Sequence, residues 1–137
     1  MAKLKRHAPA LLLLAGLCVL AYIPILQFPF IADDYTQIPM ASVYGAPSGW
    51  AQLSQDSAFR FRFTYIELTW LLHRLFGFTP APFYAASIAL HIACTWIVYA
   101  TGVWSRIGWN VALPAAAFFA VYEGHQEAVM WVAASME

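Results

Sequence analysis

The sequence predicts an all-α membrane protein with three transmembrane helices, and with interfacial amphipathic helices in the first outer loop. Hydrophobic residues make up 62% of the 137 positions and charged residues only 10%, whereas a typical soluble domain has about 25% charged residues. Mean hydropathy is +0.63. The apolar residues are concentrated in three runs, and all the charged residues lie outside these runs.

The first apolar run, residues 9 to 30, contains no charged side chain. As a helix it would span roughly 33 Å, which is enough to cross a bilayer. A cleaved signal peptide is the alternative, but its apolar core is usually about 7 to 15 residues long. Residues 1 to 8 include Lys3, Lys5 and Arg6, so the positive-inside rule places the amino terminus in the cytoplasm.

Residues 31 to 82 form the predicted outer loop, which begins with the adjacent carboxylates of Asp33 and Asp34. Two short helices are expected in it, at 33 to 43 and at 50 to 57, because turn-forming residues separate them. Asp33 either caps the first of these helices or takes part in a reaction at the membrane boundary. The two interpretations are equally compatible with the residues alone.

A further helix is expected at residues 60 to 77, where Arg60, Glu67 and Arg74 recur every seven residues and form one polar stripe. Burying Glu67 and Arg74 in hydrocarbon would cost about 2.5 to 3.5 kcal/mol each. The helix is therefore predicted to lie along the membrane interface, with spanning as the alternative.

The second apolar run, residues 83 to 104, predicts another transmembrane helix. Its one ionisable side chain near the middle is His91. An imidazole at this depth is expected to be neutral and hydrogen-bonded to another helix; the alternative is a ligand role.

Residues 105 to 110 form a short cytoplasmic connection that contains Arg106. Residues 107 to 122 are expected to return as a third span, and residues 123 to 137 to form a second outer loop or the start of another helix. This topology puts every carboxylate of the chain on the outer side of the membrane, namely Asp33, Asp34, Asp56, Glu67, Glu123, Glu127 and Glu137. The two acidic clusters that follow the first and third spans should therefore meet at one membrane face.

The distribution of charge excludes a nucleic-acid-binding role, because only the amino terminus has a basic cluster. The chain ends abruptly at Ser135-Met136-Glu137, without a polar terminus. We therefore expect it to be an amino-terminal piece of a longer protein, and to be inactive alone because three spans cannot enclose a complete site.

Several short motifs follow one another along the chain, from Asp33-Asp34-Tyr35 after the first apolar run to His125-Gln126-Glu127 after the third. In their order and spacing they resemble the amino-terminal region of GT-C membrane glycosyltransferases, above all the dolichyl-phosphate-mannose protein mannosyltransferases and their bacterial relatives. The similarity covers residues 9 to 137. It departs from the family pattern at Arg62-Phe63, Tyr122-Glu123 and Ser87, so the acidic pair is the closest match. The matching segments are Asp33-Asp34-Tyr35, Phe61-Arg62, Leu75-Phe76-Gly77, His91, Phe119-Ala120-Val121 and His125-Gln126-Glu127-Ala128-Val129-Met130-Trp131.

The resemblance implies an enzyme that moves a sugar from a polyprenyl-phosphate donor to a protein or glycan acceptor on the outer face, in a bacterial inner membrane. Asp33 or Asp34 would be the catalytic base. Arg62 would bind the phosphate, or else serve only as an interfacial anchor. His125 and Glu127 would orient the acceptor or a divalent cation.

A divalent cation is a further expectation, since carboxylates and imidazole suit hard or borderline metals. Two other classes of protein stay open. A non-catalytic multi-pass protein would use its acidic residues as helix caps and its spans for assembly. A transporter would need more ionisable groups deep in the membrane than His91 alone.

Overall fold

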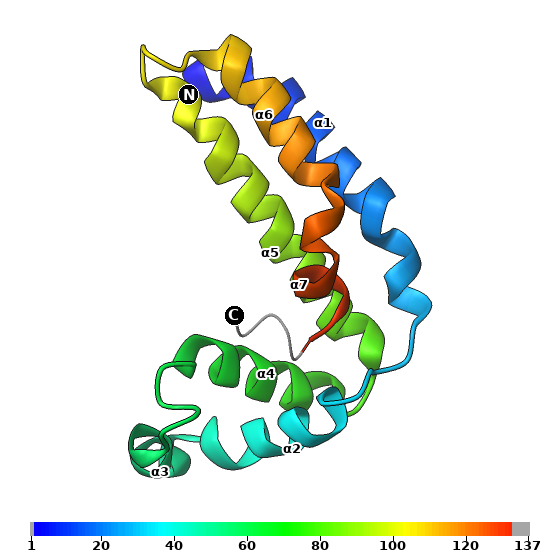
Figure 1. Ribbon diagram of the computed structural model, residues 1–137, viewed down its shortest axis with the longest axis vertical. Helices are drawn as coiled ribbons and strands as arrows, with labels where there is room; N and C mark the ends of the chain where they lie inside the picture. The colour runs from blue at the N-terminus through cyan, green and yellow to red at the C-terminus, as the bar shows by residue number, and fades with distance from the viewer. Residues whose placement is uncertain (1, 133–137) are drawn as a thin grey trace.

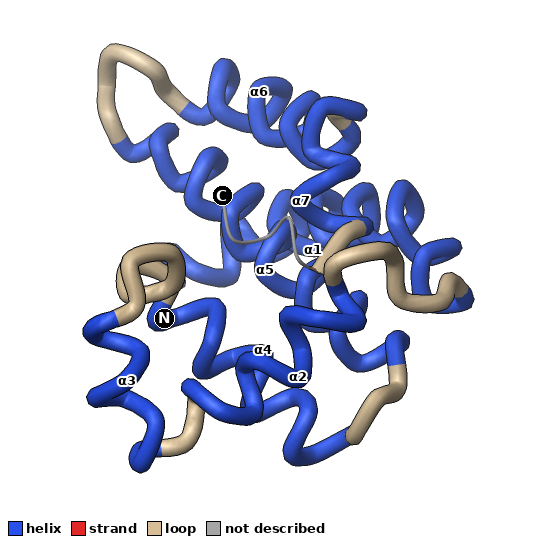
Figure 2. Tube along the Cα trace, turned by 60° about the horizontal axis from the view of Figure 1, so that its bottom comes forward, coloured by secondary structure: helices blue, strands red, loops and turns tan. Residues whose placement is uncertain are grey.

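The structure is a computed structural model that describes residues 2–132, with side chains from residue 6 onward. Within these residues all regular elements are helices, which confirms the predicted all-α class (Figures 1 and 2). The chain has two parts. The bundle consists of α1 (Ala2–Tyr22), α5 (Pro80–Ala100) and α6 (Trp109–Val121). The platform consists of α2 (Asp34–Tyr44), α3 (Trp50–Gln55) and α4 (Phe63–Phe76).

Two helices of the bundle are long and apolar enough to cross a membrane. A 3₁₀ turn at Ile23–Gln27 extends α1, and another at Thr101–Val103 extends α5. The third expected span, 107 to 122, is not confirmed as a span. Its helix α6 has 13 residues, a length of about 20 Å, whereas the hydrocarbon core of a bilayer is about 30 Å thick.

Close packing in the bundle depends on small side chains of α6. Ala112, Ala116 and Ala120 recur every four residues on one face and are at most 1% exposed. Two of them, Ala112 and Ala116, pack with Leu14 of α1 and Tyr99 of α5. Small residues at such a repeat let helix backbones approach closely.

The buried side chains of His91 and Thr95 have hydrogen-bond partners on the helices of the bundle itself. His91 Nε2 donates to the Ala120 carbonyl oxygen on α6 at 3.1 Å. The Thr95 hydroxyl donates to the His91 carbonyl oxygen at 2.8 Å and lies 3.4 Å from the Cys18 sulfur on α1. The prediction that His91 is bonded to another helix is confirmed.

The platform helices differ slightly from their expected bounds. The helix expected at 60 to 77 begins at Phe63, so Arg60 precedes it and the sevenfold polar stripe is interrupted. The core of the platform is small and consists of Ala41, Leu53 and Ile66. Because this core is small, side-chain hydrogen bonds also hold the helices and loops of the platform together. They pair Tyr44 with Asp56, Trp50 with Glu67, and Ser42 with His73.

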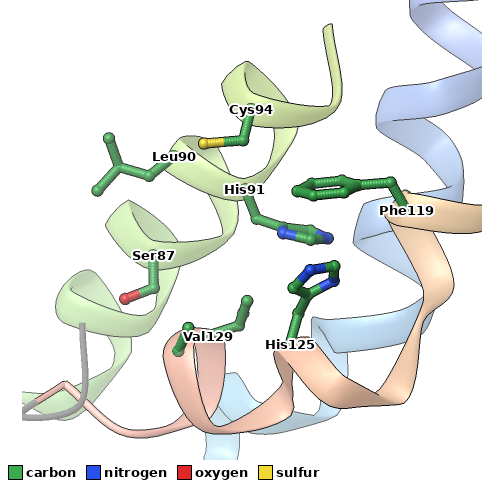
Figure 3. Close-up of a pocket in the computed structure, with 8 residues that line it drawn as sticks. Ser87, Leu90, His91, Cys94, Phe119, His125 and Val129 are labelled. Atoms are coloured by element: carbon green, nitrogen blue, oxygen red, sulfur yellow. The ribbon is translucent and has the colours of Figure 1, made fainter. Parts of the chain in front are cut away.

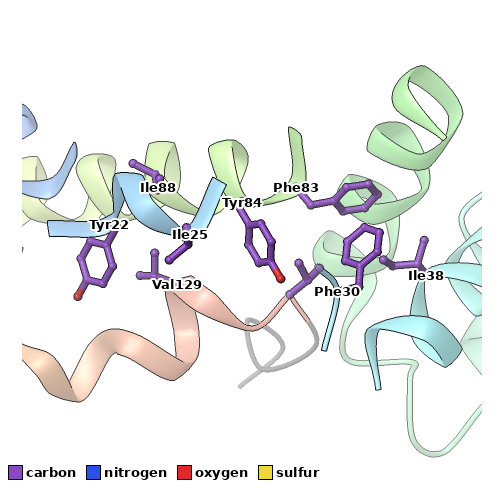
Figure 4. Close-up of a cluster of buried hydrophobic side chains, with 9 residues drawn as sticks. Tyr22, Ile25, Phe30, Ile38, Phe83, Tyr84, Ile88 and Val129 are labelled. Carbon is purple, nitrogen blue, oxygen red and sulfur yellow. The ribbon is translucent and has the colours of Figure 1, made fainter. Parts of the chain in front are cut away.

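A cluster of aromatic and aliphatic side chains joins the bundle to the platform (Figure 4). Phe30, from the segment that leaves the bundle, packs edge-on against Phe83 of α5 at 5.3 Å between ring centroids. Ile38 of α2 belongs to the same cluster. The Tyr84 hydroxyl donates to the Pro29 carbonyl oxygen at 2.7 Å. These contacts fix where the chain emerges from α1, and therefore where the acidic pair lies.

Candidate functional site

The acidic pair lies in a tight turn at the junction of bundle and platform. The Asp34 amide donates to the Ile31 carbonyl oxygen at 2.9 Å, and the Ile31 amide donates to Asp34 Oδ2 at 3.0 Å. Between them Ala32 has a φ of 41°, a left-handed conformation that is uncommon for residues other than glycine. Strained backbone of this kind often occurs at functional sites.

The two aspartates differ in their environments. Asp34 is fully buried, and its carboxylate holds the turn through Ile31. Asp33 is exposed and occupies the N-cap position of α2, but its side chain makes no capping hydrogen bond. The structure therefore does not show the side-chain capping of α2 that the sequence allowed for Asp33.

The second acidic segment comes to the same place. After α6, a 3₁₀ turn at Glu123–His125 leads into the short helix α7 (Gln126–Met130), which packs against α5. A hollow of about 250 Å³ separates α7 from the acidic turn and is lined by Ile31, Gln126, Glu127, Met130 and Trp131. Of the residues in the two acidic clusters only Glu127 lines this hollow, where it faces Ile31 of the acidic turn; Asp33, Asp34 and Glu123 do not line it. That the two clusters meet at one membrane face stays a prediction.

The indole of Trp131 contributes an unused donor to this region. Its Nε1 atom is buried and has no hydrogen-bond partner among residues 2–132. A buried donor without a partner is costly, by about 1 to 3 kcal/mol. A ligand with an acceptor oxygen in this hollow would remove that cost.

Tyr65 of α4 lies near enough to Asp34 and Arg62 for both charges to affect the pKa of its hydroxyl. Burial raises the pKa of its hydroxyl to about 12; the charge of Asp34 also raises it, while a hydrogen bond to Thr69 and the charge of Arg62 lower it. Both charges therefore act on one phenol. The hydroxyl itself donates to Gln37 Oε1 at 3.4 Å. Because its pKa is far above physiological pH, the hydroxyl is neutral there.

Arg62 lies directly before α4 and is half-buried. Its guanidinium is 5.9 Å from the centre of the Phe59 ring, and its carbonyl oxygen accepts the Ile66 amide at 3.0 Å. A freely snorkelling interfacial anchor would be more exposed than this. Its printed ring contact is with Phe59, which packs against the platform core, so the phosphate-binding role of Arg62 stays a prediction.

His125 points toward the rings of His91 and Phe119 (Figure 3). Its ring lies 4.3 Å from the Phe119 ring and 5.5 Å from the His91 ring. These three rings line a second hollow of about 250 Å³, with mostly apolar neighbours on α5 and α7. His125 and Glu127, which we expected to act together, therefore line different hollows.

The expected metal ligands are not gathered into one cluster. Among residues 2–132, no group of three or more His, Cys, Asp or Glu side chains is placed to hold a metal ion. The divalent cation stays a prediction, and the chemistry below is derived without it.

Sequence reasoning missed two residues of this site. Nothing in the sequence marks Tyr65 as part of a site, because a tyrosine among phenylalanines and leucines gives no sign of a charged neighbour. Trp131 closes the motif Glu-Ala-Val-Met-Trp, which the resemblance includes, but tryptophan near a membrane boundary is usually an interfacial anchor. Only the buried, unpartnered nitrogen distinguishes it.

The fold and the site define an all-helical chain with two helices long and apolar enough to cross a membrane, and with a strained acidic turn where those helices meet the platform. Comparisons with protein-family models, with curated proteins and with solved structures gave no match. The functional argument therefore rests on the residues and their geometry.

Proposed function

We propose that the chain is part of a GT-C type membrane glycosyltransferase, which transfers a sugar from a polyprenyl-phosphate donor to an acceptor at the outer face of a membrane. The observation that carries this proposal is the hollow between the acidic turn and α7. It joins two polar segments that are about 90 residues apart in sequence.

The outer surface of the bundle supports a membrane location. Leu12, Leu20 and Ile97 are between 69% and 76% exposed, and exposed leucine and isoleucine on long apolar helices favour a hydrocarbon solvent. A polyprenyl chain would stay in this hydrocarbon. Its phosphate and sugar would lie at the junction with the platform.

Asp33 is the proposed catalytic base, because its carboxylate is exposed and has no structural hydrogen bond. In the transfer, the acceptor hydroxyl oxygen forms a bond to the anomeric carbon, and its proton passes to the Asp33 carboxylate. The bond from the anomeric carbon to the phosphate oxygen breaks. The polyprenyl phosphate leaves with that electron pair.

The departing phosphate needs donors and a positive charge. Arg62 supplies a guanidinium suited to bidentate binding of phosphate, and the buried Trp131 Nε1 supplies a neutral donor. Glu127, exposed at the same hollow, is placed to bind hydroxyl groups of the sugar or the acceptor. His125 lines the other hollow and has no part in this scheme.

A non-catalytic multi-pass protein is the competing function, and the hydrogen bond from Ile31 to Asp34 favours it. A carboxylate that holds a turn has a sufficient structural reason to be present. In that case the exposed Asp33 would have no function, and removing its charge would change nothing measurable.

Asparagine substitutions separate the two functions. In the full-length protein, Asp33→Asn should reduce sugar transfer from polyprenyl-phosphate mannose by about 10² to 10⁴-fold, the usual contribution of a general base, without changing the unfolding temperature. Asp34→Asn should lower both transfer and the unfolding temperature, because it weakens the turn.

The matched control is Glu123→Gln, which changes another exposed carboxylate that has no role in the proposed transfer. It should leave transfer within about twofold of the unmodified protein, as expected for a surface change. Full transfer by Asp33→Asn would contradict the proposed base. No transfer by the unmodified protein from any polyprenyl-phosphate sugar would favour the non-catalytic function.

A further inference from the structure

The end of the bundle opposite the acidic turn is built from the first residues of α1, the last of α5 and the first of α6 (Figure 1). His7 Nδ1 lies 2.8 Å from the Tyr99 hydroxyl, and the His7 ring packs on the Trp109 ring at 4.2 Å between centroids. These contacts bring Arg6 of α1 to the same end as the loop between α5 and α6. We name this region the basic end.

Charge at the basic end has one sign only. Arg6 and Arg106 are both exposed there, and Lys3 and Lys5 precede them in the sequence. The acidic residues of the described chain all lie in the platform, the acidic turn or the segment after α6: Asp33, Asp34, Asp56, Glu67, Glu123 and Glu127. Arg6 and Arg106 therefore have no carboxylate partner among the described residues.

A hollow of about 400 Å³ opens in the loop of the basic end, and it is lined by Trp104, Ser105, Arg106 and Ile107. The loop is fixed by its backbone, because the Ile107 and Gly108 amides donate to the Trp104 carbonyl oxygen at 3.0 and 2.9 Å. Its lining combines a guanidinium and a hydroxyl with an indole and an aliphatic side chain. This mixture suits a ligand that is anionic on one side and apolar on the other.

We propose that this hollow binds the headgroup of an anionic phospholipid. It lies at the end of both long apolar helices, which is the depth of the phosphate layer if those helices cross a bilayer. Arg106 would bind the phosphate and Ser105 would donate to one of its oxygens. This inference uses no residue of the acidic turn and does not depend on sugar transfer.

The apolar surroundings favour a lipid over a soluble anion. Trp104 is 62% exposed and Val103 is 70% exposed, both beside the hollow. A small water-soluble phosphate would leave these side chains in water. The glycerol region of a phospholipid would cover them, as it does for tryptophans of the interfacial belt.

The test is a titration of the purified chain in mild detergent with phosphatidylglycerol or phosphatidylcholine, in which native mass spectrometry counts the bound lipids. Arg106→Gln should weaken phosphatidylglycerol binding by about fivefold, which corresponds to the loss of one cation beside an anionic headgroup. Arg60→Gln, an exposed arginine on the platform, is the matched control and should bind phosphatidylglycerol as the unmodified chain does. Trp104→Ala should weaken binding of the same lipid by a smaller factor.

Circular dichroism shows whether each variant keeps its helical content, and both glutamine variants change only exposed side chains. Phosphatidylglycerol bound no more tightly than phosphatidylcholine would overturn the proposal. So would unchanged binding by Arg106→Gln, or an equal loss in Arg60→Gln. Displacement of the lipid by excess inorganic phosphate would show a simple anion site instead of a lipid site, and would also overturn it.

Discussion

The bundle and the platform are both helical, but they differ in whether their polar side chains lie inside or near the surface. In the bundle, His91 and Thr95 are buried and bonded internally, while large apolar side chains such as Leu20 face outward. In the platform, Ile66 and Leu53 are buried, and the polar groups of Asp56 and Glu67 lie at or near the surface. The comparison shows that the bundle pairs its polar side chains internally, whereas the platform keeps most of its charged side chains at least partly accessible.

The largest expected effect concerns the packing of the platform. A Cβ atom at Gly45 would lie 2.6 Å from Trp70 Cγ and 2.8 Å from the Ala41 carbonyl oxygen. Gly45→Ala should therefore lower the free energy of unfolding by about 3 kcal/mol, at the upper end of overpacking costs. Thermal unfolding in detergent, followed by circular dichroism, measures this change.

The control for that substitution is Gly16→Ala on the outer face of α1, where a Cβ would meet nothing within 4 Å. It should be neutral or stabilise the chain by up to about 1 kcal/mol, because alanine favours helix more than glycine does. If Gly45→Ala proved as harmless as Gly16→Ala, the contact between position 45 and Trp70 would be looser than the structure indicates.

The next effect concerns the alanine face of α6. Ala116 is fully buried between α1 and α5, so Ala116→Leu should destabilise the bundle by about 2 kcal/mol. Ala115→Leu, one residue away on the exposed face, should change stability by less than about 0.5 kcal/mol. Equal effects in the same unfolding assay would show that α6 is not packed through this face.

The smallest expected effect is on the pH dependence of folding stability, and it involves a carboxylate of the platform. Hydrogen bonds from the Ala58 amide and the Tyr44 hydroxyl lower the pKa of Asp56 below its ordinary value of 3.8. Because the native pKa is the lower one, Asp56 stabilises the folded state above that ordinary value, and this contribution is lost as pH falls through the native pKa. The bundle has no equivalent carboxylate network.

Asp56→Asn should therefore flatten the dependence of the unfolding temperature on pH below about pH 4. Tyr44→Phe, which removes one of the hydrogen bonds to this carboxylate, should flatten it only in part. A pH dependence that is unchanged in Asp56→Asn would assign the acid sensitivity to another carboxylate.

The sequence was sufficient for the helical class because apolar periodicity and helix breakers are local signals. Pro80 begins α5 and Gly77 ends α4 with a positive φ of 60°, both as such residues usually do. His91 was also predictable, since a lone imidazole in an apolar helix needs a partner on another helix. These features depend on few neighbours.

The structure added what depends on contacts between distant residues. The bounds of α6 lie within two residues of the expected 107 to 122, and the structure adds that the helix starts only after Gly108, which has a positive φ of 69°. The different environments of Asp33 and Asp34 follow from how Tyr84 and Phe30 fix the preceding segment. Neighbouring aspartates look alike in sequence, and only the tertiary packing makes one buried and the other exposed.

The short length of α6 affects how deeply water could reach into the bundle. If α1 and α5 cross a bilayer, a partner helix of about 20 Å stops roughly 10 Å before the far edge of the hydrocarbon. Glu123, directly after it, would then need either a locally thinned bilayer or a hydrated notch that reaches down from the surface. Such a notch would give hydrophilic molecules a route to the side of α5 that lipid would otherwise seal.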